Sequence, residues 1–216
     1  MMAVNVGDKP LADFSQPIEM LKDCHRRIEH FLDVLKKVNA QFGSGELTPD
    51  ARRALDASLN YFANFAPRHT ADEEQSLFPR MRSSKSTAAN EAITELDRLE
   101  DDHRRGDAGH ALVDQLGREW LAKGRIDEAQ RISLQRALDE LTLLYAEHIR
   151  LEEQQVFVLA YQLLDPEQLR DIGQEMRRRR SLTCLKPEDA EAIGEQGRLL
   201  PTAERDEGGR RCHTGK

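Results

Sequence analysis

Residues 148–157 of the chain read HIRLEEQQVF and residues 69–78 read HTADEEQSLF, so one His-x-x-x-Glu-Glu-Gln segment occurs twice, 79 residues apart. A second pair of segments, LKDCHRR at 21–27 and LEDDHRR at 99–105, repeats with an offset of 78 residues. Self-similarity at a nearly constant spacing is typical of a duplicated structural unit. The chain therefore contains two copies of one unit, each with a lone histidine followed by a His-x-x-x-Glu pair.

The composition is that of long helices with charged surfaces. Charged residues make up 33% of the chain and hydrophobic residues 38%, while Gly and Pro are few. Capping and first-turn residues at 48–50 (Thr-Pro-Asp) and 165–167 (Asp-Pro-Glu) mark helix starts. These patterns predict an all-α fold, and Pro67 predicts a kink. The expected helices span 17–41, 49–82, 87–122 and 128–164, with a short fifth helix over 166–180.

Each long predicted helix carries an apolar seam at alternating steps of three and four residues. Every seam is interrupted by a histidine, and in the second and fourth helices a glutamate follows. The third seam carries a further histidine, His110, two turns after His103. Pairing the two repeated hairpins predicts an up-down-up-down four-helix bundle over residues 17–180. A lead of residues 1–16 precedes it, and a tail of residues 181–216, which lacks apolar periodicity, is expected to be disordered. The polar residues in the seams are His25, His69, Glu73, His103, His148 and Glu152.

Charge and cysteine content disfavour nucleic-acid-binding, membrane-associated and disulfide-rich secreted proteins. The net charge of −7 disfavours nucleic-acid and anionic-membrane partners, which call for a clustered positive field. The run of arginines at 177–180 is typical of a solvated helix end. No secretory signal and no apolar run of membrane-spanning length is found. The three cysteines (Cys24, Cys184 and Cys212) have no CxxC spacing, which favours reduced thiols in a cytoplasmic protein and makes them poor candidates for ligands.

The seam residues are suited to binding metal. On a helix, His and Glu four residues apart lie on one face, so both reach the same region. A carboxylate buried in a core costs several kcal/mol unless it is paired, and a cation pairs with both glutamates and all four imidazoles. This donor set suits iron, manganese or zinc. Two six-coordinate ions offer about 12 positions, of which these side chains and one bridging oxygen fill about 10, so two ions are favoured.

In these residues the chain resembles the hemerythrin-like (HHE cation-binding) family, specifically a bacterial branch with the order His, His-x-x-x-Glu, His, His-x-x-x-Glu. The resemblance covers residues 17–164. It implies a di-iron centre (Fe2+/Fe3+) with a bridging oxo or hydroxo group inside a four-helix bundle. By position it implies terminal nitrogen ligands at the four histidines and bridging carboxylates at the two glutamates. Ferritin-like di-iron proteins are the nearest alternative, but their Glu-x-x-His spacing occurs here only at Glu100 and His103.

Other polar residues near the seams are weaker candidates. His30 falls off its seam, and Glu74 and Glu153 are expected to be solvated. The remaining candidates for contact with a metal or its ligands are Glu29, Asp107, His110 and Tyr145.

One side of the predicted centre differs between the repeats. Gly106 occupies the place of Ile28, so the turn after His103 presents no side chain to the seam. By resemblance, oxygen-carrying members have another histidine where this chain has Asp107. We therefore expect an exogenous ligand to reach the centre beside His103.

Two functional classes fit such a centre. The first is a protein that binds or senses dioxygen, nitric oxide or peroxide, with a partner protein supplying any signal output. The second is an iron-handling or peroxide-decomposing enzyme. The sequence does not distinguish the two classes, nor does it determine the oligomeric state.

Overall fold

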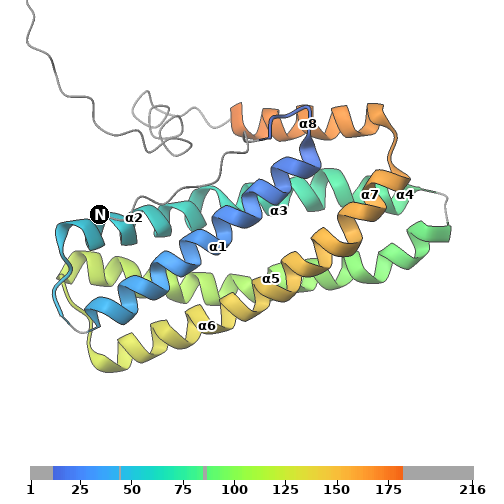
Figure 1. The fold of residues 1–216 in the computed structure, drawn as a ribbon. Coiled ribbons are helices and arrows are strands. Elements are labelled where there is room, and N and C mark those ends of the chain that lie inside the picture. The colour runs from blue at the N-terminus through green and yellow to red at the C-terminus, as the bar shows by residue number, and fades with distance from the viewer. Residues whose placement is uncertain (1–11, 44, 85–86, 182–216) are drawn as a thin grey trace, which may run out of the picture. The chain divides into compact units, whose positions relative to one another are not determined.

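The computed structural model describes residues 12–43, 45–84 and 87–181. Over these ranges the expected all-α fold is confirmed, because every regular element is helical and no strand occurs (Figure 1). The predicted tail and most of the predicted N-terminal lead lie outside the described residues. None of the described helices is both long and apolar enough to cross a membrane.

The bundle is formed by helical rods that pack in a ring. Helix α1 contacts α2 and α6, and α5 contacts the same two helices on the other side, which is the neighbour relation of an up-down-up-down bundle. The first hairpin comprises α1 (Pro17–Phe42), α2 (Pro49–Asn64), α3 (Ala66–Asp72), η1 (Glu73–Leu77) and α4 (Phe78–Ser83). The second comprises α5 (Thr87–Lys123), α6 (Glu128–Leu151), η2 (Glu152–Val156) and α7 (Phe157–Leu163), and α8 (Pro166–Ser181) follows.

The predicted kink in the second rod is confirmed. The rod breaks between α2 and α3 at Phe65, whose φ of −111° departs from helical geometry. Pro67 lies two residues further on and has no N–H to give to the carbonyl of Ala63, so the helical hydrogen-bond ladder cannot run through this point. The Thr48 side chain accepts a hydrogen bond from Ala51 N and begins α2 as expected.

Two π-helical turns, η1 and η2, were not expected from the sequence. They begin at Glu73 and Glu152, the glutamates of the two His-x-x-x-Glu segments. In each turn the N–H five residues on, at Phe78 or Phe157, donates to the glutamate carbonyl. The repeat therefore extends to an unusual backbone feature, of a kind that occurs often at functional sites.

The apolar core is divided by a polar layer. Along α1, Ile18 and Leu21 belong to one buried cluster, and the residues from Ile28 onward belong to another. His25 lies between the two clusters. The same order occurs along α5 and the reverse order along α6, so the histidines lie in a layer with apolar packing on both sides.

Candidate metal centre

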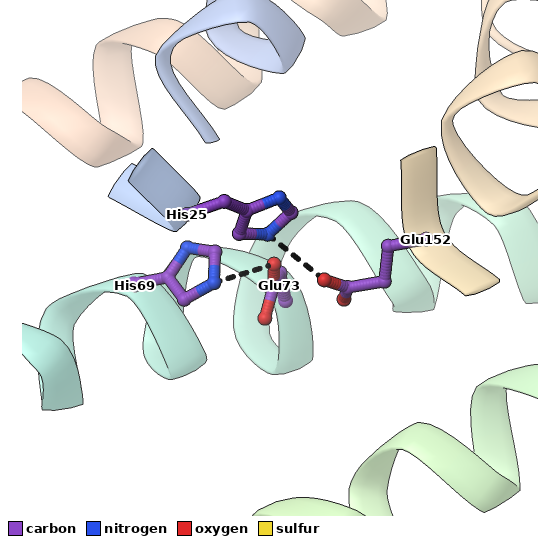
Figure 2. Close-up of side chains that lie close together, drawn as sticks. All are labelled: His25, His69, Glu73 and Glu152. Atoms are coloured by element: carbon purple, nitrogen blue, oxygen red, sulfur yellow. Dashed lines mark ion pairs between the residues drawn. The ribbon is translucent and has the colours of Figure 1, made fainter. Parts of the chain in front are cut away.

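The structure brings all six seam residues together in this layer. We call them the His/Glu cluster: His25, His69, Glu73, His103, His148 and Glu152. Their donor atoms form two overlapping groups, each with all its atoms within 4.8 Å of one another. One group contains His25 and His69, the other contains His103 and His148, and Glu73 and Glu152 belong to both. Figure 2 shows the first group.

Each glutamate faces one histidine of each group. Glu152 Oε2 lies 2.9 Å from His25 Nε2 and 3.4 Å from His148 Nε2. Glu73 Oε1 lies 3.2 Å from His69 Nε2, and its Oε2 lies 3.4 Å from His103 Nε2. The two carboxylates therefore stand between two pairs of imidazoles, the arrangement needed to bridge two ions.

The donor atoms of the cluster have no other use in the protein. The four Nε2 atoms and the four glutamate oxygens are buried, and among the described residues they have no hydrogen-bond partner outside the cluster and face only one another, as in the 2.9 Å ion pair of His25 Nε2 with Glu152 Oε2. A buried polar atom without a good partner costs about 1–3 kcal/mol, so such a concentration of them is not expected in an inert core. A cation bound by these atoms would compensate them all, and the residues therefore fit a metal centre.

The pKa values of the two inner glutamates also indicate that the cluster is suited to a cation. Burial raises the pKa of Glu73 well above its usual value, and the charge of Glu152 raises it further. Burial also acts on Glu152, but the neighbouring His148 and His25 outweigh it and lower its pKa. Without a cation, the two adjacent carboxylates are accommodated only when one is protonated and the other ionised.

A second layer of carboxylates holds two of the histidines. From the sequence, Glu74 and Glu153 are expected to be solvated, but both side chains are about one-third exposed and bond histidine rings. Glu153 Oε1 lies 2.9 Å from His25 Nδ1, and Glu74 Oε1 lies 2.8 Å from His103 Nδ1. Each of these hydrogen bonds joins one hairpin to the other and directs Nε2 of the ring into the cluster. The doubled Glu-Glu in both repeats was the available signal, because it places a second acid beside each inner one.

The Nδ1 atoms of the remaining two histidines, His69 and His148, have different surroundings. His148 Nδ1 lies 3.8 Å from Asp102 Oδ2. Cys24 occupies the place of Asp102 in the first repeat, and within the described residues His69 Nδ1 has no hydrogen-bond partner. Burial raises the pKa of the Cys24 thiol. The residues around the histidines therefore differ between the two repeats, with an aspartate beside His148 and a cysteine in the equivalent place of the first repeat.

The weaker candidates separate into two kinds. His30, Glu29 and Asp107 are exposed and take no part in the two donor groups. His110 and Tyr145 instead form a partly buried pair, with His110 Nε2 at 2.8 Å from the Tyr145 hydroxyl.

The pH dependence of stability should reveal the buried His110. Burial lowers its pKa to about 4, so unfolding takes up a proton between about pH 4 and 6.5 and stability falls as the pH drops through this window. In metal-free protein, the His110→Leu variant should escape this loss. Its unfolding free energy relative to wild type should improve by about 2 kcal/mol between about pH 7.5 and pH 5 in urea titrations. His30→Leu, at an exposed site, is the control, and parallel pH profiles for wild type and His110→Leu would contradict a buried neutral His110.

Helix α8 contacts the first hairpin beside the centre. Arg179 and Arg180 each donate to one carboxylate oxygen of Asp72, at 2.7 Å, and the Asp72 side chain is fully buried directly before Glu73. Glu175 of α8 also pairs with Arg80 of α4. The expectation that the 177–180 arginine run is merely a solvated helix end is therefore wrong for Arg179 and Arg180, because a buried aspartate requires their charge.

Comparison with known proteins agrees with this geometry. An uncharacterized protein of Haemophilus influenzae is 28% identical to the chain over 172 residues, which cover 79% of this chain and 94% of that protein. A family model, the hemerythrin HHE cation-binding domain, matches residues 16–160, a range that contains both repeats and the whole His/Glu cluster. The chain therefore belongs to the hemerythrin HHE cation-binding family.

Proposed function

We propose that the His/Glu cluster holds two iron ions joined by an oxo or hydroxo bridge, and that the protein uses this centre to bind or sense dioxygen, nitric oxide or peroxide. The observation that carries the proposal is the set of eight buried donor atoms that face one another and, among the described residues, have no hydrogen-bond partner outside the cluster. Imidazole and carboxylate donors suit iron, and the buried Cys24, the one cysteine among the described residues, belongs to neither donor group.

In this proposal the four histidines are terminal ligands and the two glutamates are bridges. The contact of each glutamate with one histidine of each donor group supports the bridging role. When bound, an iron pair supplies two redox-active ions to which a small ligand can bind. The apolar clusters on both sides of the layer limit the entry of water, and Glu74 and Glu153 keep the rings of His103 and His25 oriented.

Iron content and anaerobic ligand binding test this function. Purified protein should contain about two irons per chain, since both donor groups are complete, and the ferrous protein should form a persistent adduct with dioxygen or nitric oxide. One zinc and no iron after growth in iron-replete medium would refute the di-iron proposal. Rapid decay to ferric product, or turnover of added peroxide, would indicate the alternative, an iron-handling or peroxide-decomposing enzyme. The cytoplasmic location and a protein partner for signal output stay predictions from the sequence.

A further inference from the structure

The two donor groups, called here the first half (with His25 and His69) and the second half (with His103 and His148), are flanked by different side chains. These flanking side chains are called the wall of each half. Beside the first half the seam positions one and two turns away are apolar and buried, and beside the second half the corresponding positions of the repeat are open or polar. In the first half these positions are Ile28, Leu32 and Ala66, and in the second they are Gly106, His110 and Tyr145. Because the hairpins are otherwise so similar, this difference breaks the symmetry at one specific place.

The polar wall is held in a defined geometry. The His110 ring stacks on Phe62 with centroids 4.9 Å apart, and its Nε2 contacts the Tyr145 hydroxyl at 2.8 Å. The Tyr145 ring meets the ring of His148 edge-on, with centroids 6.1 Å apart. Tyr145 therefore lies against a histidine of the second donor group, one helical turn before it along α6.

Counting hydrogens shows that the pair has a donor to spare. Burial lowers the pKa of His110 to about 4, so the ring is neutral near pH 7 and carries one N–H, while Tyr145 carries one O–H. One of these two hydrogens lies between the residues, and the other is left over. If the second hydrogen were on His110 Nδ1, it would have no acceptor, because this atom is buried without a hydrogen-bond partner among the described residues. If Nε2 carries the ring hydrogen, the phenol hydrogen can turn toward a third group.

That third group would lie toward the centre. A tyrosine hydroxyl is protonated at neutral pH, and Tyr145 lies one turn before His148 on α6, with its ring against the ring of His148. A hydroxyl hydrogen left over in this partly buried pair gains from a further acceptor, and an acceptor bound at the centre would supply it.

The same wall carries less side-chain bulk than the wall of the first half. A Cβ added at Gly106 would meet only ordinary contacts, 3.6 Å from Leu144 and 3.8 Å from His110, whereas Ile28 fills the equivalent place in the first half with a whole side chain. The His103 side chain is 9% exposed, against 1% for that of His25. Access is therefore greater on the side where the spare donor lies.

We propose that Tyr145, oriented by His110, donates a hydrogen bond to a small anionic ligand bound at the His103/His148 half of the centre. The inference rests on the proposed di-iron function and deepens it by assigning the half that takes the ligand and the ligand's chemical class. Small anions such as azide or the anion of peroxide accept such a hydrogen bond, and a charge-assisted bond of this kind is stronger than a neutral one. In the first half the corresponding positions, Ile28, Leu32 and Ala66, carry no hydrogen-bond donor in their side chains.

Azide is the probe for this assignment. Tyr145→Phe and His110→Leu should each weaken azide binding to the ferric protein by about tenfold, the equivalent of one ordinary hydrogen bond, and the double variant should lose little more than either alone. The azide stretching frequency should shift between H2O and D2O in wild type and stop shifting in Tyr145→Phe. The control is Tyr61→Phe, which removes a buried hydroxyl that bonds the Cys24 carbonyl on the first side, and azide affinity should be unchanged.

A steric variant tests the location independently. Gly106→Leu should keep both irons and prevent azide from binding, because the added side chain would occupy the position beside His103 at which the wild type has none. Elemental analysis distinguishes failure of the di-iron function from failure of the Tyr145 assignment. Wild-type protein without two irons would overturn the proposed function itself. Two irons with azide affinity and isotope shift unaffected by Tyr145→Phe, or with azide still bound in Gly106→Leu, would overturn only the present assignment.

Discussion

Glu152→Ala is expected to reduce the iron content from about two ions per chain to fewer than one, because Glu152 belongs to both donor groups and its loss opens both positions. His69→Ala removes a donor from one group only and should retain more iron. A metal that binds only the folded chain stabilises it by about 4 kcal/mol at 1,000 times its dissociation constant. The thermal midpoint of the iron-loaded protein should therefore fall strongly in Glu152→Ala, as followed by calorimetry alongside elemental analysis.

Two comparisons make this result specific. His30→Ala, at an exposed site on α1, should change neither iron content nor thermal midpoint. In metal-free protein the stability cost of Glu152→Ala should largely disappear, because the substitution also relieves the crowding of two buried carboxylates. A Glu152→Ala variant that retains two irons would show that Glu152 is not a bridging ligand.

Deletion of residues 166–216, which removes α8, should abolish recovery of stably folded protein. Ile172 and Met176 of α8 are fully buried, and each contributes about 1.5–3 kcal/mol through burial. The deletion would also leave the buried Asp72 without Arg179 and Arg180, at a cost of about 3–5 kcal/mol. Together these losses are comparable to the whole stability of a typical domain, about 5–15 kcal/mol.

The matched truncation removes only residues 183–216. That segment has no periodic apolar face in its sequence, so helicity and iron content should be nearly unchanged. Circular dichroism and size-exclusion chromatography compare the two truncated proteins, and the double substitution of Arg179 and Arg180 by alanine separates the charge effect from burial. A stable, iron-loaded protein without α8 would show that this helix is dispensable, and loss of iron on removing 183–216 would show that the tail supports the bundle.

The sequence by itself determined the helical fold and the six residues of the His/Glu cluster. Both follow from local periodicity: apolar seams at steps of three and four define the inward face, and His-x-x-x-Glu places two donors on that face one turn apart. The duplication added the relation between the hairpins, because equal donor sets at equal depths meet when the hairpins pair. No long-range contact had to be known for this inference.

The tertiary structure alone decided the surroundings of the cluster. Glu153 and His25 are 128 residues apart, and Glu74 and His103 are 29 apart, so no local pattern pairs them. Likewise, the partners of Asp72 come from α8, and an arginine run at a helix end resembles a solvated terminus until its neighbours are known. The π-helical turns at Glu73 and Glu152 do not change the apolar seam pattern before them, so that pattern could not predict them. Such a backbone is retained only where the surrounding packing compensates the altered hydrogen bonds.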